Sequence, residues 1–198
     1  MSFSMSKSST ILPQALILAA VAAAYAIMRR QKTTTNMLNN YKLPRGYRNN
    51  NPCNVIYSAT NNWQGKIYDN TDGRFEQFRD MTYGYRAALA LLRGDGYIGK
   101  GKANTIRQII TKFAPSFEND TANYIADVSR LTGIDPDTVI ARNDRDSLTK
   151  IVQAMSIVEN GTTYTYTDPV TGQKRTTNLK QDYNLPNMEI INEAWEML

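Results

Sequence analysis

The chain has 198 residues, enough for one domain and a short appendage, and its formal charge of +5 suits any polyanion, from nucleic acid to a bacterial wall. It has no histidine and a single cysteine, Cys53, which excludes an internal disulfide, Cys- or His-ligated metal sites and histidine-dependent nucleophilic catalysis. An enzyme of this composition must use carboxylates, hydroxyls, amides or lysines, and we expect neither a metal nor a cofactor.

An uncharged apolar run extends from Ile11 to Met28, and a basic stretch follows it at residues 29–32. Roughly 18 residues are just enough to cross a hydrocarbon core of about 30 Å as a helix, and basic residues commonly flank such a segment. The sequence therefore predicts a tail and single-pass membrane anchor over residues 1–32. The alternatives are a signal peptide cleaved at residues 24–26 and a buried helix.

A polar tether at residues 33–43 leads into a domain that we expect at residues 44–198. Up to about residue 82, short aromatic or β-branched pieces alternate with prolines and glycines, which predicts a small β-lobe. The apolar spacing then becomes helical, apart from one alternating Thr-Tyr segment that is typical of a hairpin. In chain order these elements are Tyr85–Leu92, Ile106–Phe113, Tyr124–Leu131, Leu148–Val158, the hairpin at Thr162–Gly172, and Ile190–Leu198. The fold class is therefore α+β, with a mostly helical body.

The most unusual stretch is Arg48-Asn-Asn-Asn-Pro-Cys-Asn-Val55, which has four amides within six residues. Asn side chains suit left-handed turns and hydrogen bonds to the backbone, which indicates a self-satisfied structural loop. The alternative is a sugar-binding edge, because amides match the donors and acceptors of hydroxyl and N-acetyl groups, and aromatic faces suit pyranose rings. The candidate substrate-binding residues are Asn49, Asn50, Asn51, Asn54, Tyr57, Trp63 and Tyr124.

Several motifs follow one another between residues 44 and 161: RGYRNNNP-x-N-V, NNWQG, GRF-x-x-F with YGYRA, APSFENDT-x-x-Y, and VENG. Together they resemble lysozyme-like virion proteins of bacteriophages. The resemblance implies a lysozyme-like fold, peptidoglycan glycan strands as substrate, and contacts with other virion proteins. Cys53 departs from the pattern, in which glycine is expected, so a positive φ at that position would require a different turn.

A more distant similarity is to flagellar and autolysin-type glucosaminidases. In these a catalytic Glu ends a helix and is followed by an Asn-rich turn, an aromatic β-lobe and another helix start. Here the turn (49–55), the lobe (63–78) and the helix start (114–124) keep that order, but no carboxylate precedes them in the domain. Glu159 alone ends an apolar-striped helix in the required way. The similarity therefore implies a circularly permuted lysozyme-like fold with Glu159 as the catalytic acid.

The position of Glu159 supports this role on physical grounds. It follows Met155 by four residues and Val152 by seven, so it borders the buried face of its helix. Burial and the negative end of the helix dipole both disfavour a carboxylate anion, which predicts a raised pKa suited to a general acid. The simpler alternative is an exposed Glu in the last helical turn.

A second carboxylate is less clear from the sequence. Asp72 and Glu76, and more generally Asp69, lie in the predicted lobe where a base or stabiliser would sit, but each also fits a turn or surface position. Without a second acid facing Glu159, a lytic transglycosylase is favoured over a hydrolase, because the substrate then supplies its own hydroxyl.

Together with these resemblances, the sequence predicts an enzyme anchored in the lipid membrane of a phage particle that cleaves peptidoglycan during entry, as a lytic transglycosylase, muramidase or glucosaminidase. A virion structural protein that keeps the fold without activity is the main alternative, and it predicts a blocked cleft or a solvent-directed Glu159. A nucleic-acid-binding module would need Lys and Arg on one face, whereas they are scattered along the chain, so we expect no nucleic-acid partner.

Overall fold

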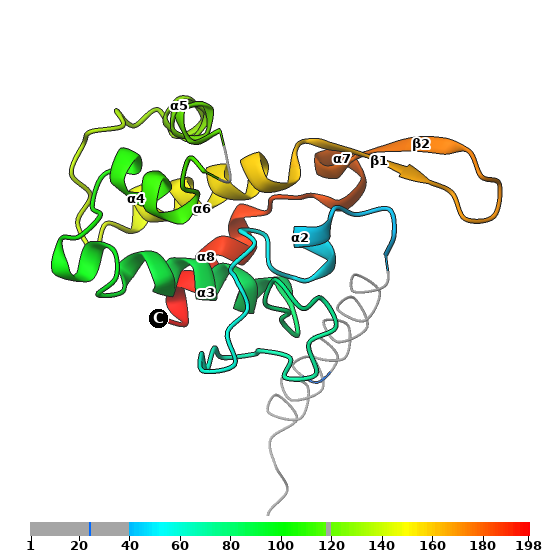
Figure 1. Cartoon of the computed structure of the whole chain (residues 1–198), viewed down its shortest axis with the longest axis horizontal. Helices are drawn as coiled ribbons and strands as arrows, with labels where there is room; N and C mark the ends of the chain where they lie inside the picture. Colours follow the sequence, from blue (N-terminus) through cyan, green and yellow to red (C-terminus); the bar gives the residue numbers. More distant parts are fainter. Residues whose placement is uncertain (1–23, 25–39, 118–119) are drawn as a thin grey trace, which may run out of the picture.

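The computed structural model describes residue 24 and residues 40–117 and 120–198 (Figure 1). Its elements in chain order are α2 (Arg45–Arg48), α3 (Met81–Arg93), the 3-10 helix η1 (Ile98–Lys100), α4 (Ile106–Phe113), α5 (Thr121–Thr132), α6 (Arg145–Asn160), β1 (Thr163–Thr167), β2 (Lys174–Asn178), α7 (Leu179–Tyr183) and α8 (Met188–Glu196). This confirms the predicted α+β class with a mostly helical body.

The predicted membrane segment Ile11–Met28 lies outside the described residues, except for Ala24, as does most of the tether at 33–43. Among the residues that the structure does describe, no helix is both long and apolar enough to cross a membrane.

The long helices α5 and α6 begin at a capping Asp and end at a Gly with positive φ. The Asp120 side chain accepts a hydrogen bond from the backbone N–H of Asn123 and so caps α5, which ends at Gly133 with φ 71°. Asp144 caps α6 in the same manner, and Gly161 with φ 73° ends that helix. These caps satisfy backbone groups that the first and last helical turns leave without intrahelical partners.

Helix α6 is the centre of the packing, because it contacts α2, α3, α5 and α8 (Figure 1). Its predicted apolar stripe is fully buried at Leu148, Ile151 and Met155. Helices α3 and α8 pack against each other, and α4 packs against α5. The burial of this stripe places the last turn of α6, with Glu159, at the border of the core.

The predicted β-lobe exists as a unit but has no regular strands. In place of strands it has two isolated antiparallel bridges, between Ile56 and Phe75 and between Lys66 and Phe78. Phe78, which forms one of these bridges, is fully buried. The only sheet formed by the described residues is the hairpin of β1 and β2.

Hydrogen bonds from Asn side chains to the backbone replace part of the strand pairing in the lobe. Asn51 Nδ2 donates to the carbonyls of Val55 and Glu76, both at 2.9 Å, and Asn51 Oδ1 accepts from the Val55 N–H. Asn50 Nδ2 donates to the Phe78 carbonyl at 2.9 Å. The lobe is therefore held by side-chain hydrogen bonds to the backbone, as the structural interpretation of the Asn-rich stretch predicts.

The predicted Thr-Tyr hairpin is confirmed and projects from the helical body (Figure 1). Its strands are antiparallel, with Tyr166 opposite Arg175. Tyr41 packs edge-on against Tyr166, with ring centroids 5.5 Å apart, so the start of the described domain lies against this hairpin.

Candidate active site

Glu159 lies in the last turn of α6, and two side chains from other elements hold its carboxyl. Asn54, in the Asn-rich turn, donates from Nδ2 to Oε2 at 2.8 Å. Tyr124, on α5, donates its hydroxyl proton to Oε1 at 2.9 Å. The carboxyl is therefore fixed between the lobe and two helices and does not extend into solvent from a helix end.

The pKa of Glu159 is raised above its ordinary value. Burial is the largest cause, because it disfavours the charged form, and the hydrogen bonds from Asn54 and Tyr124 partly oppose it. The predicted direction of the pKa shift is confirmed, and the alternative of an exposed Glu is wrong. A carboxyl of this kind retains a transferable proton at higher pH than an ordinary Glu.

Close packing between α6 and α2 sets the position of Glu159. The neighbouring Asn160 donates from Nδ2 to the carbonyls of Pro52 and Ser156, at 2.7 and 2.8 Å. On α2, Gly46 approaches so closely that a Cβ atom there would lie 2.4 Å from Asn160 Oδ1. The end of α6 is thus bonded to the Asn-rich turn that supplies Asn54.

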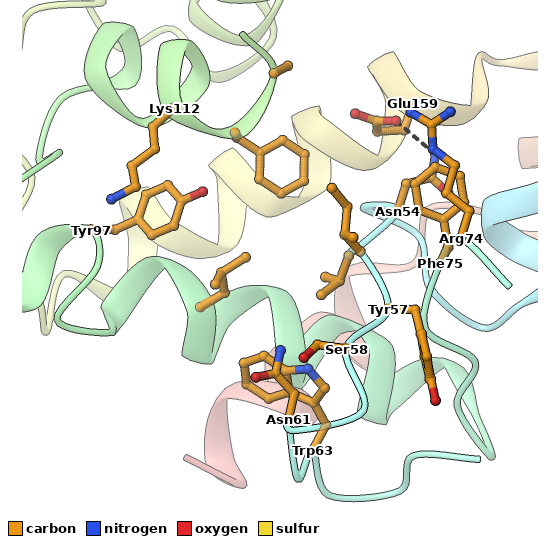
Figure 2. A pocket seen from close by; sticks show the side chains of 15 residues that line it. Asn54, Tyr57, Ser58, Asn61, Trp63, Arg74, Phe75, Tyr97, Lys112 and Glu159 are labelled. Carbon is orange, nitrogen blue, oxygen red and sulfur yellow. Dashed lines mark hydrogen bonds between the residues drawn. The ribbon is translucent and has the colours of Figure 1, made fainter. Parts of the chain in front are cut away.

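A cavity of about 400 Å³ opens beside Glu159, between the lobe and the helical body (Figure 2). Its lining comprises Asn54, Val55, Ile56, Tyr57, Ser58, Asn61, Trp63, Arg74, Phe75, Leu91, Tyr97, Lys112, Phe113, Ala114 and Glu159. We call it the main cavity. Aromatic and aliphatic side chains alternate with a few polar groups, as in sites for small ligands. Of the described residues in this lining, Glu159 is the only carboxylate.

A second cavity of about 380 Å³ also borders Glu159, and we call it the side cavity. Its lining comprises Asp120, Asn123, Tyr124, Asp127, Val158 and Glu159. The carboxylate oxygens of Asp120 bond to Asn123, and Asp127 forms an ion pair with Arg130 at 2.7 Å. Glu159 therefore borders both cavities. The other two carboxylates of the side cavity, Asp120 and Asp127, interact with residues of α5.

Three of the predicted substrate-binding residues line the main cavity with Glu159, namely Asn54, Tyr57 and Trp63 (Figure 2). The indole Nε1 of Trp63 is buried without a hydrogen-bond partner among the described residues. Tyr124 lines the side cavity, but it is 7% exposed and its hydroxyl bonds to Glu159. Tyr124 is therefore a residue that positions the Glu159 carboxyl.

The predicted substrate contacts of Asn49, Asn50 and Asn51 are corrected by their burial. Their exposed fractions are 4%, 0% and 0%, and none lines either cavity. Asn50 and Asn51 bond to the backbone of the lobe, as described above, and Asn49 donates to Asp72 at 2.8 Å. Side chains that solvent does not reach cannot contact a glycan, so these three are structural. Cys53, at the position where the resemblance leads us to expect glycine, does not have a positive φ, so the turn does not require glycine there. Positive φ occurs at Asn50 and Asn54 instead.

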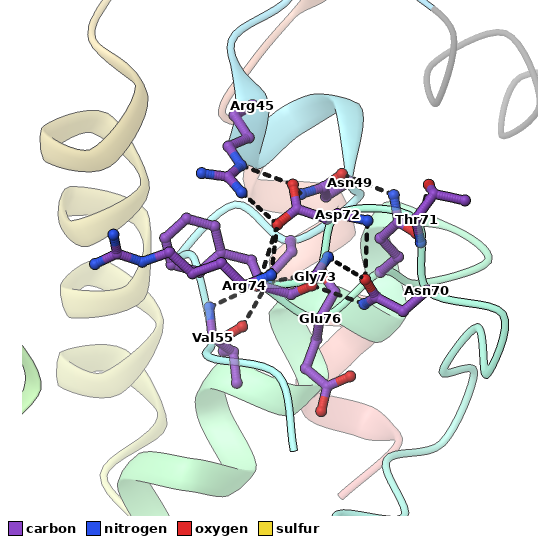
Figure 3. A network of polar contacts seen from close by, with 12 residues as sticks. Arg45, Asn49, Val55, Asn70, Thr71, Asp72, Gly73, Arg74 and Glu76 are labelled. Carbon is purple, nitrogen blue, oxygen red and sulfur yellow. Dashed lines mark hydrogen bonds and ion pairs between the residues drawn. The ribbon is translucent and has the colours of Figure 1, made fainter. Parts of the chain in front are cut away.

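Neither candidate second carboxylate faces the main cavity. Glu76 is fully buried in an ion pair with Lys66 at 3.0 Å. Asp72 accepts two hydrogen bonds from Arg45, at 2.6 and 2.7 Å, and one from Asn49 (Figure 3). These bonds, with further ones from the backbone, outweigh burial and hold the pKa of Asp72 well below its usual range.

Both predictions of a second catalytic carboxylate are therefore corrected, because these groups stabilise the lobe. Asp69 is exposed and lines neither cavity. Within the described residues, no three His, Cys, Asp or Glu side chains gather as a metal site.

Sequence reasoning missed several residues of the main cavity, above all the cations Arg74 and Lys112. Arg74 belongs to the GRF motif, which was a usable signal. Lys112 precedes Phe113 at the end of α4 and carries no sequence signal of its own, because an isolated Lys in a last helical turn is ordinary.

No protein-family model matches the sequence. The chain is similar to Protein P5 of Pseudoalteromonas phage PM2, with 38% identity over 125 residues. The matched region is 62% of this chain and 75% of the phage PM2 protein.

Proposed function

This chain belongs to the family of Protein P5 of Pseudoalteromonas phage PM2, and we propose that it is a virion-associated lytic transglycosylase that cleaves the glycan strands of peptidoglycan. The observation that carries the proposal is Glu159. It is a single, largely buried carboxyl with a raised pKa, held by Asn54 and Tyr124 at the meeting point of two cavities. The lysozyme-like, circularly permuted fold implied by the sequence motifs is part of this proposal.

In the first step, protonated Glu159 donates its proton to the oxygen of the glycosidic bond. The C1–O bond breaks, one sugar leaves with a free hydroxyl, and positive charge develops at C1 of the other. Proton donation by one positioned group typically contributes about 10²–10⁴-fold in rate. Asn54 and Tyr124 then stabilise the Glu159 carboxylate that remains, because each already donates to one of its oxygens.

In the second step, the C6 hydroxyl of the same sugar attacks C1 and its proton passes to Glu159, which restores the acid. The product has an internal anhydro ring and no water is consumed. This route is favoured over hydrolysis because the main cavity offers no second described carboxylate to activate water or to form a covalent intermediate.

The rest of the main cavity suits an N-acetylated sugar. Trp63 and Tyr57 supply aromatic surface to the lining, which suits the apolar face of a pyranose ring. Asn61 and Ser58 add polar groups that match sugar hydroxyls. The domain would act while held by the predicted anchor, residues 1–32, in the lipid membrane of the phage particle, beside other virion proteins.

A second candidate function is a virion structural protein without activity. One observation favours it: both Glu159 oxygens already hold intramolecular hydrogen bonds, which is how a purely structural carboxyl is satisfied. The open main cavity beside Glu159 favours the enzyme.

The test uses the full chain in mild detergent with purified peptidoglycan from the host wall. The enzyme proposal predicts clearing of the suspension by the parent and loss of about 10²-fold or more in rate for Glu159→Gln, which keeps the shape but removes the transferable proton. Glu189→Gln, at an exposed position of α8 that lines neither cavity, is the matched control and should clear as fast as the parent. No clearing by the folded parent over a range of pH would support the structural candidate.

A further inference from the structure

The described lining of the main cavity has more cationic than anionic side chains. Among the described residues of its lining, the charged side chains are Arg74, Lys112 and Glu159. An excess of positive charge in a concave site attracts anionic ligands.

Lys112 is held in place at this cavity and does not extend freely from α4. Its Nζ donates to the Gly96 carbonyl and lies 4.9 Å from the centroid of the Tyr97 ring. Tyr97 is itself only 8% exposed and belongs to the hydrophobic core, so the ring beneath the ammonium is packed against the body. An ammonium has three donors, which leaves capacity for a ligand after the bond to Gly96. A cation–π contact and one backbone bond thus orient the remaining donors.

The two ends of the main cavity differ in chemistry. Figure 2 shows Lys112 and Tyr97 on the side opposite Glu159, Asn54 and Arg74. A sugar ring bound beside Glu159 therefore leaves room for a substituent that reaches toward Lys112. A carboxylate at that end would accept a charge-assisted hydrogen bond from Lys112, which is stronger than the bond that a neutral hydroxyl would accept.

We infer that the main cavity selects muramyl sugars that carry an anionic peptide stem, with Lys112 as the group that binds a stem carboxylate. This inference rests on the proposed function, and it identifies the peptide stem as the part of the substrate that the enzyme recognises. In peptidoglycan every second sugar carries a lactyl-linked peptide with free carboxylates, whereas the sugars of chitin carry none. Lys112 is thus a specificity residue and takes no part in bond cleavage.

The experiment compares two forms of one glycan strand with the full chain. The first form keeps its stem carboxylates, and in the second they are converted to neutral methylamides. Binding is measured with the Glu159→Gln background, so that strands stay intact, and cleavage is measured with the parent. Lys112→Gln is compared with Lys102→Gln, which removes an equal charge from an exposed position outside the cavity lining.

We expect neutralising the carboxylates to weaken binding by about threefold to tenfold, as for a partly exposed charge pair. Lys112→Gln should weaken binding of the charged strand by a similar factor and leave the neutral strand unchanged, while Lys102→Gln changes neither. Raising the salt concentration from about 0.05 M to about 0.5 M should reduce the difference between strands, because it screens exposed charges.

Equal binding of the two strands, or equal losses in Lys112→Gln and Lys102→Gln, would overturn the inference. Such a result with strand cleavage intact leaves the enzyme proposal standing. Stem-dependent binding through Lys112 without any cleavage by the parent would reject the enzyme proposal and keep the selective cavity.

Discussion

The Tyr124 hydroxyl donates a 2.9 Å hydrogen bond to Glu159 across 35 positions of sequence, and so joins α5 to the last turn of α6. Burial raises the pKa of Glu159, and this bond acts in the opposite direction by favouring the anion. The proton affinity of the candidate acid is therefore a balance between burial and two donors, which single substitutions can disturb in known directions.

Tyr124→Phe removes one donor and keeps the ring. Because this bond lowers the pKa of Glu159, its loss should raise that pKa further and move the basic limb of the pH profile of kcat/KM to higher pH. The free energy of unfolding should fall by about 1 kcal/mol. Tyr166→Phe, on the hairpin, is the control and should leave the limb in place. A limb that moves to lower pH in Tyr124→Phe would contradict the assignment.

Asn54 has φ 50°, which separates its backbone role from its side-chain role. Asn54→Gly and Asn54→Ala both remove the donor to Glu159 Oε2, so both should raise the pKa of Glu159 and shift the profile equally. Ala alone is strained at this φ, and we expect it to be about 1–2 kcal/mol less stable than Gly in urea unfolding. Equal stabilities would mean that the turn relaxes.

Glu159→Gln should stabilise the protein at neutral pH. A raised folded-state pKa means that the carboxyl contributes stability below its ordinary value of 4.5, and this contribution is lost as pH rises through the folded-state pKa. The amide has no such titration. The thermal midpoint of Glu159→Gln should therefore exceed that of the parent at pH 7, with the gap closing at pH 4. A lower midpoint at pH 7 would show that Glu159 stabilises the fold as an anion.

The pair of Lys66 and Glu76 should be structural. Lys66→Met leaves a fully buried carboxylate without its partner and should reduce the free energy of unfolding by about 3–5 kcal/mol. Lys100→Met breaks the pair with Asp95, which has the same 3.0 Å distance but side chains 65% and 59% exposed, and should change it by less than about 1 kcal/mol. Similar losses in the two variants would contradict the burial of the first pair.

The helices and the hairpin were predictable because their signals are local. The stripe from Leu148 to Val158 and the caps at Asp120 and Gly161 depend on residues within one or two turns. The position of Glu159 at the border of the core follows from the same periodicity, and so does the direction of its pKa shift.

The partners of Glu159 and the roles of the lobe carboxylates were not predictable in the same way. Asn54 lies 105 positions from Glu159, so nothing in the local pattern joins them. The sequence favours a turn, a surface position or a second acid for Glu76, because carboxylates are rarely buried. Only the tertiary structure brings Lys66 to it. The lobe lacks strands because buried Asn side chains replace ladder bonds, which strand patterns do not reveal.

The most direct test of the account is mass analysis of the soluble fragments that the full chain releases from purified peptidoglycan. If Glu159 is the acid of a lytic transglycosylase, the fragments have anhydro ends and are one water lighter than hydrolysis products, and Glu159→Gln releases them about 10²-fold or more slowly. Fragments with ordinary reducing ends would replace the transglycosylase by a hydrolase. Equal release by the parent and Glu159→Gln, or none by either, would contradict the claim that Glu159 cleaves the glycan.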